Sequence, residues 1–300
     1  MQNRLRGNSE QRTWHLMLVP ALVLALVFSY LPMFGIVMAF QKFNPGRGFF
    51  GSAFIGLDNF RYVFNLRGFT GALYNTVYIS FLKIVFGILT PLLVALAINE
   101  VDQKRFARAA QTSIFLPFFL SWVVLGGVIR QILDLEGPIN SLIERAGGQP
   151  IMFLLRNDWF PTVLVVTDVW KGMGYNMVIF LAAISSIDLS PYESAQIDGA
   201  GRLKQTWYLT LPALMPTILL LSTLAIGNLL NAGFDQVFML YNPIVYESGD
   251  IIDTFVYRLG LVNRQYAPAA AVGVFKSLVS VLLVGSSYYL AHRFNDYSIF

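Results

Sequence analysis

The residues best suited to chemistry are charged and polar side chains inside otherwise apolar stretches. Asp168 and Lys171 are three positions apart in the apolar run 161–186, so a helix would place them on one face. Charged groups are costly within a membrane, where they usually face a ligand, a water-filled path or an opposite charge. Tyr175 follows one turn after Lys171. This face therefore combines charge, hydrogen bonding and an aromatic ring.

Neighbouring positions extend this candidate binding surface. Gly172 carries no side chain, so a ligand ring could approach the backbone, and Asn176 adds an amide. A later apolar run offers Asn228 and Asn231, with Asp235 at the next turn of the same helical face. Aromatic rings stack on the apolar faces of sugar rings, while amides and charges bind hydroxyls. The predicted binding residues are Asp168, Lys171, Gly172, Tyr175, Asn176, Asn228 and Asn231.

Each of these side chains also has a purely structural interpretation. Asp168 and Lys171 would form an internal ion pair that holds one helix to a neighbour. The asparagines would form hydrogen bonds between helices, as they commonly do in membranes. Two further lysines in apolar runs, Lys83 and Lys276, are expected at a subunit interface or with their ammonium groups reaching the membrane surface, without a binding role.

Composition defines the elements that must position these residues. Of 300 residues, 56% are hydrophobic and 13% are charged, whereas soluble domains average about 45–50% and 25%. This excludes a soluble globular enzyme. Six apolar stretches are each long enough to cross a hydrocarbon core of about 30 Å. They are residues 15–41, 72–98, 108–130, 161–186, 210–234 and 269–292. We expect an all-α polytopic membrane protein with a tail at 1–14 and a six-helix domain at 15–300.

Loop charge predicts the orientation of these helices. The first apolar run is too long for a signal peptide and lacks a small-residue cleavage site, so we expect it to be retained. Six spans place both termini on one side. Basic residues are equally numerous on the two sides, but those on the terminal side lie in shorter loops, which favours cytoplasmic termini. Within the last external connector, residues 251–261 have the spacing of a short interfacial helix with Asp253, Thr254 and Arg258 facing away.

Charge and residue usage exclude several other classes. The net charge is only +4 and the basic residues are scattered, which argues against nucleic-acid binding. There are no cysteines, and the two histidines, His15 and His292, lie at opposite ends of the chain, so we expect no metal site.

The loop at about 187–209 predicts its own fold. Ser190 and Glu193 have the spacing of a capping box, and Pro191 suits the first helical position. Gly199 and Gly201 are expected to stop this helix because glycine accepts the left-handed conformation. A second helix would then resume and lead into the membrane. The product is a helix-turn-helix elbow on the cytoplasmic side.

This loop resembles the glutamate-alanine-alanine signature of ABC importer permeases, with a later Leu211-Pro212 at the family's offset. The one departure is Ser194 in place of the first alanine. In that family the elbow is a coupling helix, which sits in a groove of a cytoplasmic ATPase. The resemblance implies ATPase-coupling roles for Glu193, Ser194, Ala195, Asp198, Gly199 and Ala200, and we predict that Arg202 adds a polar contact to the ATPase.

Other segments resemble the polysaccharide and oligosaccharide permeases of the carbohydrate uptake (maltose-type) group. These segments are 30–35, 75–76, 116–117, 168–171 and 253–258. The resemblance implies a type I ABC importer permease fold in the bacterial plasma (inner) membrane. It also implies a second, non-identical permease subunit, a cytoplasmic ATPase dimer, an extracytoplasmic solute-binding protein and an oligosaccharide substrate. The sequence has no G-x-x-x-x-G-K-[ST] motif. We therefore expect this chain to bind no cofactor and not to be an enzyme, with ATP and Mg on the ATPase subunits.

The sequence is also compatible with three alternatives. One is an ABC importer permease for another small solute. A second is a stand-alone carrier that uses Asp168 and Lys171 as an ion relay, although the sequence has no internal repeat in its favour. A third is a membrane-embedded glycan-modifying enzyme with Asp134 and Glu136 as its acid and base, but their spacing beside Gly137 is more typical of a turn. Nothing in the sequence names the sugar.

Overall fold

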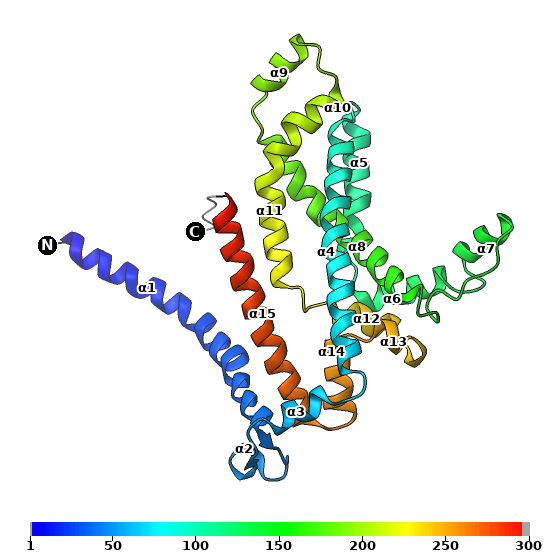
Figure 1. Ribbon diagram of the computed structural model, residues 1–300. Helices are drawn as coiled ribbons and strands as arrows, with labels where there is room; N and C mark the ends of the chain where they lie inside the picture. The colour runs from blue at the N-terminus through cyan, green and yellow to red at the C-terminus, as the bar shows by residue number, and fades with distance from the viewer. Residues whose placement is uncertain (1, 296–300) are drawn as a thin grey trace. The chain divides into compact units, whose positions relative to one another are not determined.

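The computed structural model describes residues 2–295, and the side chains of residues 14–289. Regular structure in this part of the chain is almost entirely helical (Figure 1), so the all-α prediction is confirmed. A single short antiparallel pair, β1 (Gln41–Lys42) and β2 (Ala53–Phe54), sets Gln41 opposite Phe54 within the described residues. The chain divides into two compact units. The first contains the chain up to Asn65 together with Val256–Phe275, and the second contains Leu66–Phe255 and the chain from Lys276 onwards.

The first unit begins with one long helical segment. It is made of α1 (Gln2–Ala25), the π-helical turn η1 (Leu26–Tyr30) and the 3₁₀ segment η2 (Leu31–Phe40). The unit also holds α2 (Gly48–Gly51), α3 (Asp58–Phe64), η6 (Arg258–Val262) and the first part of α15 (Tyr266–Asn295). Asn59 of α3 donates from Nδ2 to the carbonyls of Ala39 and Gln41, both at 2.9 Å, and so ties α3 to the end of η2.

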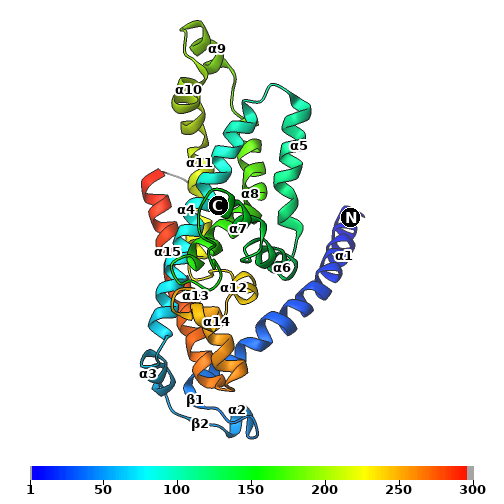
Figure 2. The same cartoon turned by 90° about the vertical axis from the view of Figure 1, so that its right-hand side faces the viewer.

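The second unit is a helical bundle around α4 (Phe69–Asn99) and α8 (Phe160–Ser185), which pack along each other. The remaining elements follow in chain order. They are α5 (Lys104–Phe115), η3 (Leu116–Phe119), α6 (Trp122–Ile132), α7 (Pro138–Arg145), α9 (Ser190–Ile197), α10 (Arg202–Gln205), η4 (Thr206–Thr210), α11 (Leu211–Gly227), α12 (Phe234–Leu240), η5 (Pro243–Val245), α13 (Tyr246–Gly249) and α14 (Ile252–Tyr257). Figures 1 and 2 both place α9 and α10 at one end of this unit and α12 and α13 away from that end.

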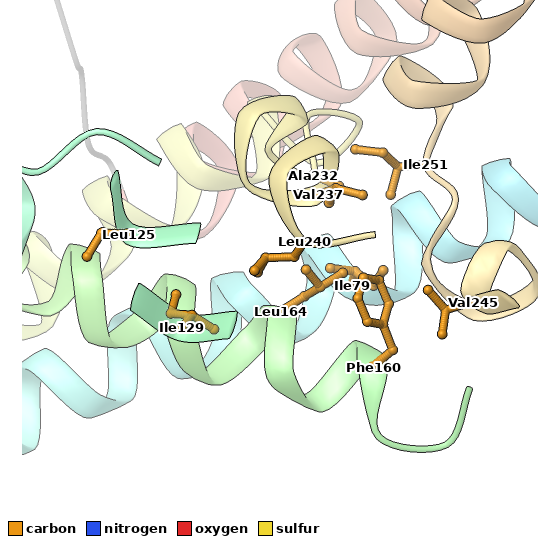
Figure 3. Packing of buried hydrophobic residues seen from close by; sticks show 10 residues of the cluster. All are labelled: Ile79, Leu125, Ile129, Phe160, Leu164, Ala232, Val237, Leu240, Val245 and Ile251. Carbon is orange, nitrogen blue, oxygen red and sulfur yellow. The ribbon is translucent and has the colours of Figure 1, made fainter. Parts of the chain in front are cut away.

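The core of the second unit forms where α12 and α6 meet the α4–α8 pair. Phe160 and Leu164 of α8 are fully buried there together with Ile79 of α4 (Figure 3). Gly249 makes room for this packing, since a Cβ at that position would lie 2.2 Å from the Phe160 ring. Gly174 similarly lets α5 approach α8, because its Cβ would lie 2.5 Å from the Phe115 backbone.

Among the described residues, four helices are long and apolar enough to cross a membrane, and up to six spans result if each of two bent pairs counts as one. The four include Trp14–Phe40 and Phe69–Asn99, at positions close to the predicted stretches. The apolar stretch predicted over 108–130 falls in one of these bent pairs, in which the chain bends by 108° between η3 and α6. Pro117 lies just before the bend, and the Ser121 side chain caps the new helix by accepting from Val124 N at 3.4 Å.

The predicted helix over 251–261 is confirmed as α14 and η6, with Ile252 and Phe255 buried. The outward orientation predicted for Thr254 is wrong, because this side chain is fully buried and donates to Asp250 Oδ1 at 2.8 Å. Lys276, which we expect at a subunit interface or the membrane surface, forms an ion pair with Asp253 of α14.

Candidate functional site

A cavity of about 290 Å³ lies among α4, α8, α11 and the segment that follows α11. Five of the seven predicted binding residues line it, namely Asp168, Gly172, Asn176, Asn228 and Asn231. Ser80, Lys83, Gly87 and Gly233 add to the wall, with apolar side chains between them. The cavity thus brings together residues that are more than 140 positions apart in the sequence.

Lys83 is the charged centre of this cavity, so the expectation that it faces an interface or the membrane surface is wrong. Its side chain is 9% exposed, and Nζ lies 3.3 Å from Asp168 Oδ1. The same ammonium donates to the Ala232 carbonyl at 2.7 Å and to Gln236 Oε1. Lys83 therefore joins three elements that are far apart in sequence.

Gln236 forms the second layer of this network. The residue is fully buried in α12, and its Nε2 donates to the Leu164 carbonyl at 2.8 Å and to Thr167 Oγ1 at 2.7 Å. It therefore holds α12 against α8 while its oxygen faces Lys83. From the sequence we assign Lys83 no binding role and do not single out Gln236, for which a polar residue in a strongly apolar setting is the available signal.

The predicted helix over 210–234 ends early, at Gly227, so Asn228 and Asn231 do not share a helical face. Asn228 terminates α11, and the next regular element, α12, begins after Gly233 at φ +90°. Irregular backbone at membrane depth is tolerated where it is buried or lines a cavity. Here Lys83 binds the Ala232 carbonyl that the interrupted helix leaves without a helical partner.

Lys171 and Tyr175 lie away from this cavity, and the predicted pairing of Lys171 with Asp168 is wrong. Lys171 Nζ donates to the Phe118 carbonyl at 3.0 Å and lies 5.4 Å from the centroid of the Phe118 ring. Tyr175 stacks on the same ring, with centroids 5.1 Å apart. Both side chains therefore support the bend between η3 and α6.

A second candidate site is the elbow formed by α9 and α10. Gly199 has φ +77°, and its N–H donates to the Gln196 carbonyl at 3.0 Å. The N–H of Ala200 donates to the Ala195 carbonyl at 2.8 Å, which completes a Schellman motif. The predicted glycine stop is thus confirmed at Gly199. It is wrong at Gly201, which is extended and serves as the N-cap of α10.

The start of α9 differs from the predicted capping box. Leu189 occupies the N-cap position without a side-chain cap, and Ser190 is the first helical residue. The Ser190 N–H donates to Asp188 Oδ1 at 3.2 Å, so an upstream carboxylate takes the role predicted for Ser190. Tyr192 then ties α9 to the membrane-leading helix through a 2.9 Å hydrogen bond between its hydroxyl and Thr210 Oγ1.

Most residues predicted to couple to an ATPase are exposed. Glu193, Ser194, Asp198, Gly199 and Arg202 are exposed, whereas Ala195 and Ala200 are half-buried. The elbow also exposes large apolar side chains: Ile197 is 88% and Leu203 is 87% exposed. Exposed apolar side chains of this size are typical of a protein–protein or membrane contact.

Arg202 is already engaged within the chain. Its guanidinium lies 3.4 Å from Glu100 Oε2 and 3.6 Å from Asp102 Oδ1, in the loop between α4 and α5. The elbow is therefore linked to the end of α4, the helix that carries Lys83.

The loop with Asp134 and Glu136 forms a turn. Asp134 Oδ1 accepts from the Glu136 N–H at 3.3 Å, and the Asp134 carbonyl accepts from Gly137 N–H at 3.0 Å. This bonding matches the structural alternative and gives no support to an acid and base pair.

Comparison with known families accounts for this architecture. Residues 13–296 match the family of the binding-protein-dependent transport system inner membrane component. The chain belongs to this family. Two relatives from Bacillus subtilis (strain 168) match along nearly the whole chain. Protein LplB is 38% identical over 95% of this chain and 90% of its own length. The polygalacturonan/rhamnogalacturonan transport system permease protein YteP is 39% identical over 97% of this chain and 91% of its own length.

A solved structure agrees with this assignment. The permease aligns with a chain from the crystal structure of a bacterial ABC transporter involved in the import of the acidic polysaccharide alginate. The TM-score is 0.88, with 35% identity over 97% of this chain and 99% of that one. A bacterial alginate ABC transporter has also been solved in complex with an alginate pentasaccharide-bound periplasmic protein. The type I importer permease fold predicted from the sequence is confirmed by this match.

Proposed function

We propose that this permease is one of two unlike membrane subunits of an ATP-driven, binding-protein-dependent importer for an oligosaccharide or polysaccharide fragment. The observation that carries the proposal is nearly full-length similarity to a polygalacturonan/rhamnogalacturonan transport system permease and to a chain of an alginate importer, combined with a polar cavity in the bundle. We place a tail at 1–14, the transmembrane domain at 15–300 and both termini in the cytoplasm of a bacterial cell, as loop charge favours.

The elbow is proposed as the docking surface for a cytoplasmic ATPase dimer. Its exposed Ile197 and Leu203 supply apolar contact, and the exposed Glu193 and Asp198 supply polar contact. ATP and Mg are bound by the ATPase subunits, and this chain is not itself an enzyme. An extracytoplasmic solute-binding protein delivers the glycan.

The cavity is proposed as this subunit's part of the substrate path. Polar groups buried in a membrane bundle are expensive, so a cavity that gathers Asp168, Asn228 and Asn231 is a candidate ligand site. Lys171 and Tyr175 lie on α8 outside the lining of this cavity. They remain predicted substrate contacts only because of their position on that helix.

The two proposed sites are mechanically continuous. From the elbow, α10 and η4 lead directly into α11, and α11 ends at the irregular segment that lines the cavity. A displacement of the elbow when the ATPases close would therefore move the cavity wall. Such a linkage provides alternating access: ATP binding opens the path outward, and hydrolysis resets it.

The test is purification of the permease with its co-expressed partners. We expect a stoichiometric ATPase, stimulated by the glycan-loaded binding protein, and ATP-dependent uptake in proteoliposomes. Purification without an ATPase, with uptake driven by an ion gradient, would instead favour the stand-alone carrier.

A further inference from the structure

The loop between η2 and α3 carries an exposed aromatic tip. The tip is the short helix α2, and Phe50 in this helix is more exposed than any other large hydrophobic side chain in the described part of the chain. Single exposed apolar residues are common on protein surfaces. What distinguishes Phe50 is the order of the loop that presents it, together with its place beyond the membrane spans.

Hydrogen bonds fix the backbone on both sides of the tip. The Asn44 N–H donates to Ser52 Oγ at 3.0 Å, and Ser52 Oγ donates to the Gly48 carbonyl at 2.7 Å. Gln41 Nε2 donates to the Phe49 carbonyl at 2.9 Å. Gly48 has φ +64°, which glycine adopts without strain. The tip is therefore formed before a partner arrives, and a surface that is ordered in advance loses less entropy on binding.

The loop separates its aromatic rings into two groups. Phe43 and Phe49 pack on each other, with ring centroids 5.5 Å apart, and Phe43 meets the edge of the Tyr266 ring at 6.4 Å. Phe50 follows Phe49 directly and yet stays outside this group. The loop thus has an apolar place for aromatic rings and leaves Phe50 out of it. Aromatic side chains are enriched in the core of protein–protein interfaces.

The tip lies beyond the ends of two candidate spans. The loop starts directly after the span Trp14–Phe40, and Phe43 contacts the first residue of the span Tyr266–Tyr289. Figures 1 and 2 both place α2 past the end of the helical segment that α1 begins and past the start of α15. Acyl chains therefore do not cover Phe50. In the proposed orientation this end of the spans is extracytoplasmic, so the partner of Phe50 is a molecule outside the membrane.

Charge and shape narrow the class of this partner. Residues 41–57 contain Lys42 and Arg47 and no Asp or Glu. Both cations are exposed, and neither forms an ion pair among the described residues. Such a surface is complementary to an apolar surface bordered by carboxylates. Small-molecule sites are concave, whereas Phe50 stands on a protruding tip, which suits insertion into a pocket of another protein.

We propose that Phe50 anchors the extracytoplasmic solute-binding protein on this permease, by entering an apolar pocket of that protein whose edge carries carboxylates for Lys42 and Arg47. The inference rests on the proposed importer function, which requires such a protein and leaves its contact surface unassigned. A periplasmic protein is bound in the solved complex of a bacterial alginate ABC transporter. The second permease subunit would meet this chain along the membrane spans, whereas α2 lies past their ends.

The first measurement is the ATPase activity of the whole transporter against the concentration of glycan-loaded binding protein. Phe50→Ala should raise the half-stimulating concentration at least several-fold. Its basal ATPase activity and Tm should equal those of the wild type, because the side chain is exposed and lies outside the core. Phe50→Trp, which keeps an aromatic ring, should retain most of the affinity.

Phe106→Ala is the matched control for this measurement, since Phe106 is an exposed phenylalanine at the proposed cytoplasmic end of the spans. Its half-stimulating concentration should equal that of the wild type. The same unchanged value in Phe50→Ala would overturn the proposal.

Salt dependence tests the charged part of the contact. Raising the ionic strength should increase the half-stimulating concentration of the wild type, because screening weakens the attraction between exposed charges. The double variant Lys42→Gln/Arg47→Gln should need more binding protein at low salt and respond less to added salt. An equal salt response of the two transporters would contradict the carboxylates assigned to the partner.

The absence of native cysteine allows a direct test of the partner, because Phe50→Cys introduces the only thiol in the chain. The thiol is labelled with benzophenone maleimide, and the whole transporter, assembled with cysteine-free partners, is illuminated in the presence of loaded binding protein. We expect a cross-link to the binding protein, which the label on Phe106→Cys should not give. A cross-link to the second permease subunit or to lipid in its place, or no cross-link, would overturn the proposal.

The same assays separate this inference from the function on which it rests. A wild-type transporter that no binding protein stimulates, or that imports no glycan with ATP, contradicts the proposed function itself. Normal stimulation of the wild type, matched by Phe50→Ala, contradicts only the role of Phe50.

Discussion

Lys83 of α4 and Asp168 of α8 form an ion pair in the cavity wall, with Nζ 3.3 Å from Oδ1. The ammonium also binds the Ala232 carbonyl in the break after α11. One side chain thus joins the two central helices to the irregular segment at the cavity wall. In a membrane bundle such a pair fixes helix positions and leaves the remaining carboxylate surface available to a ligand.

The first prediction concerns this pair. Lys83→Met leaves Asp168 and the Ala232 carbonyl without their cation, and breaking a buried pair on one side costs about 3–5 kcal/mol in soluble proteins. We expect a clear fall in the Tm of the purified permease. The double variant Lys83→Met/Asp168→Asn, which removes both charges, should lose less. An equal Tm for the single and double variants would show that the pair does not hold the helices.

The second prediction concerns the turn of the elbow. Gly199 has φ +77° with open space around its Cα, so Gly199→Ala acts only through backbone strain, about 1–2 kcal/mol. The strain should shift α9 and reduce ATP-dependent uptake several-fold, while the protein remains in the membrane. Gly201→Ala is the control, because Gly201 also has open space and its φ of −69° suits any residue. Equal uptake by the two variants would contradict a coupling role for this turn.

The third prediction concerns Arg202. Its partners, Glu100 and Asp102, are exposed to solvent, so Arg202→Ala should change stability by less than about 1 kcal/mol. If the link between the elbow and α4 transmits motion, the number of ATP molecules hydrolysed per glycan should nevertheless rise. The double variant Arg202→Glu/Glu100→Arg exchanges the two charges, so it should restore part of the coupling between ATP hydrolysis and glycan uptake. If Arg202→Ala hydrolyses the same number of ATP molecules per glycan as the wild type, the link between the elbow and α4 does not transmit motion.

Local signals predicted the elbow, whereas the cavity depended on distant partners. A Schellman turn involves only neighbouring residues, so Gly199 could be identified from the sequence. Lys83 could not, because its acceptors in α12 and the preceding segment lie about 150 positions away. For the same reason, the sequence predicts Asn228 and Asn231 on one face of a helix, whereas α11 ends at Gly227. The break that places them is bonded to Lys83 through the Ala232 carbonyl.

The last prediction tests that break. Gly233 has φ +90°, and a Cβ there would lie 3.2 Å from Lys83 Nζ. Gly233→Ala therefore strains the backbone by about 1–2 kcal/mol. The added methyl group also crowds the ammonium of Lys83. We expect a lower Tm and impaired uptake. Gly273→Ala in α15 is the control: it has open space and lies within a helix, where alanine is favoured by up to about 1 kcal/mol. Unaltered Tm and uptake in Gly233→Ala would mean that the segment between α11 and α12 tolerates rearrangement, and that Lys83 does not fix the cavity wall.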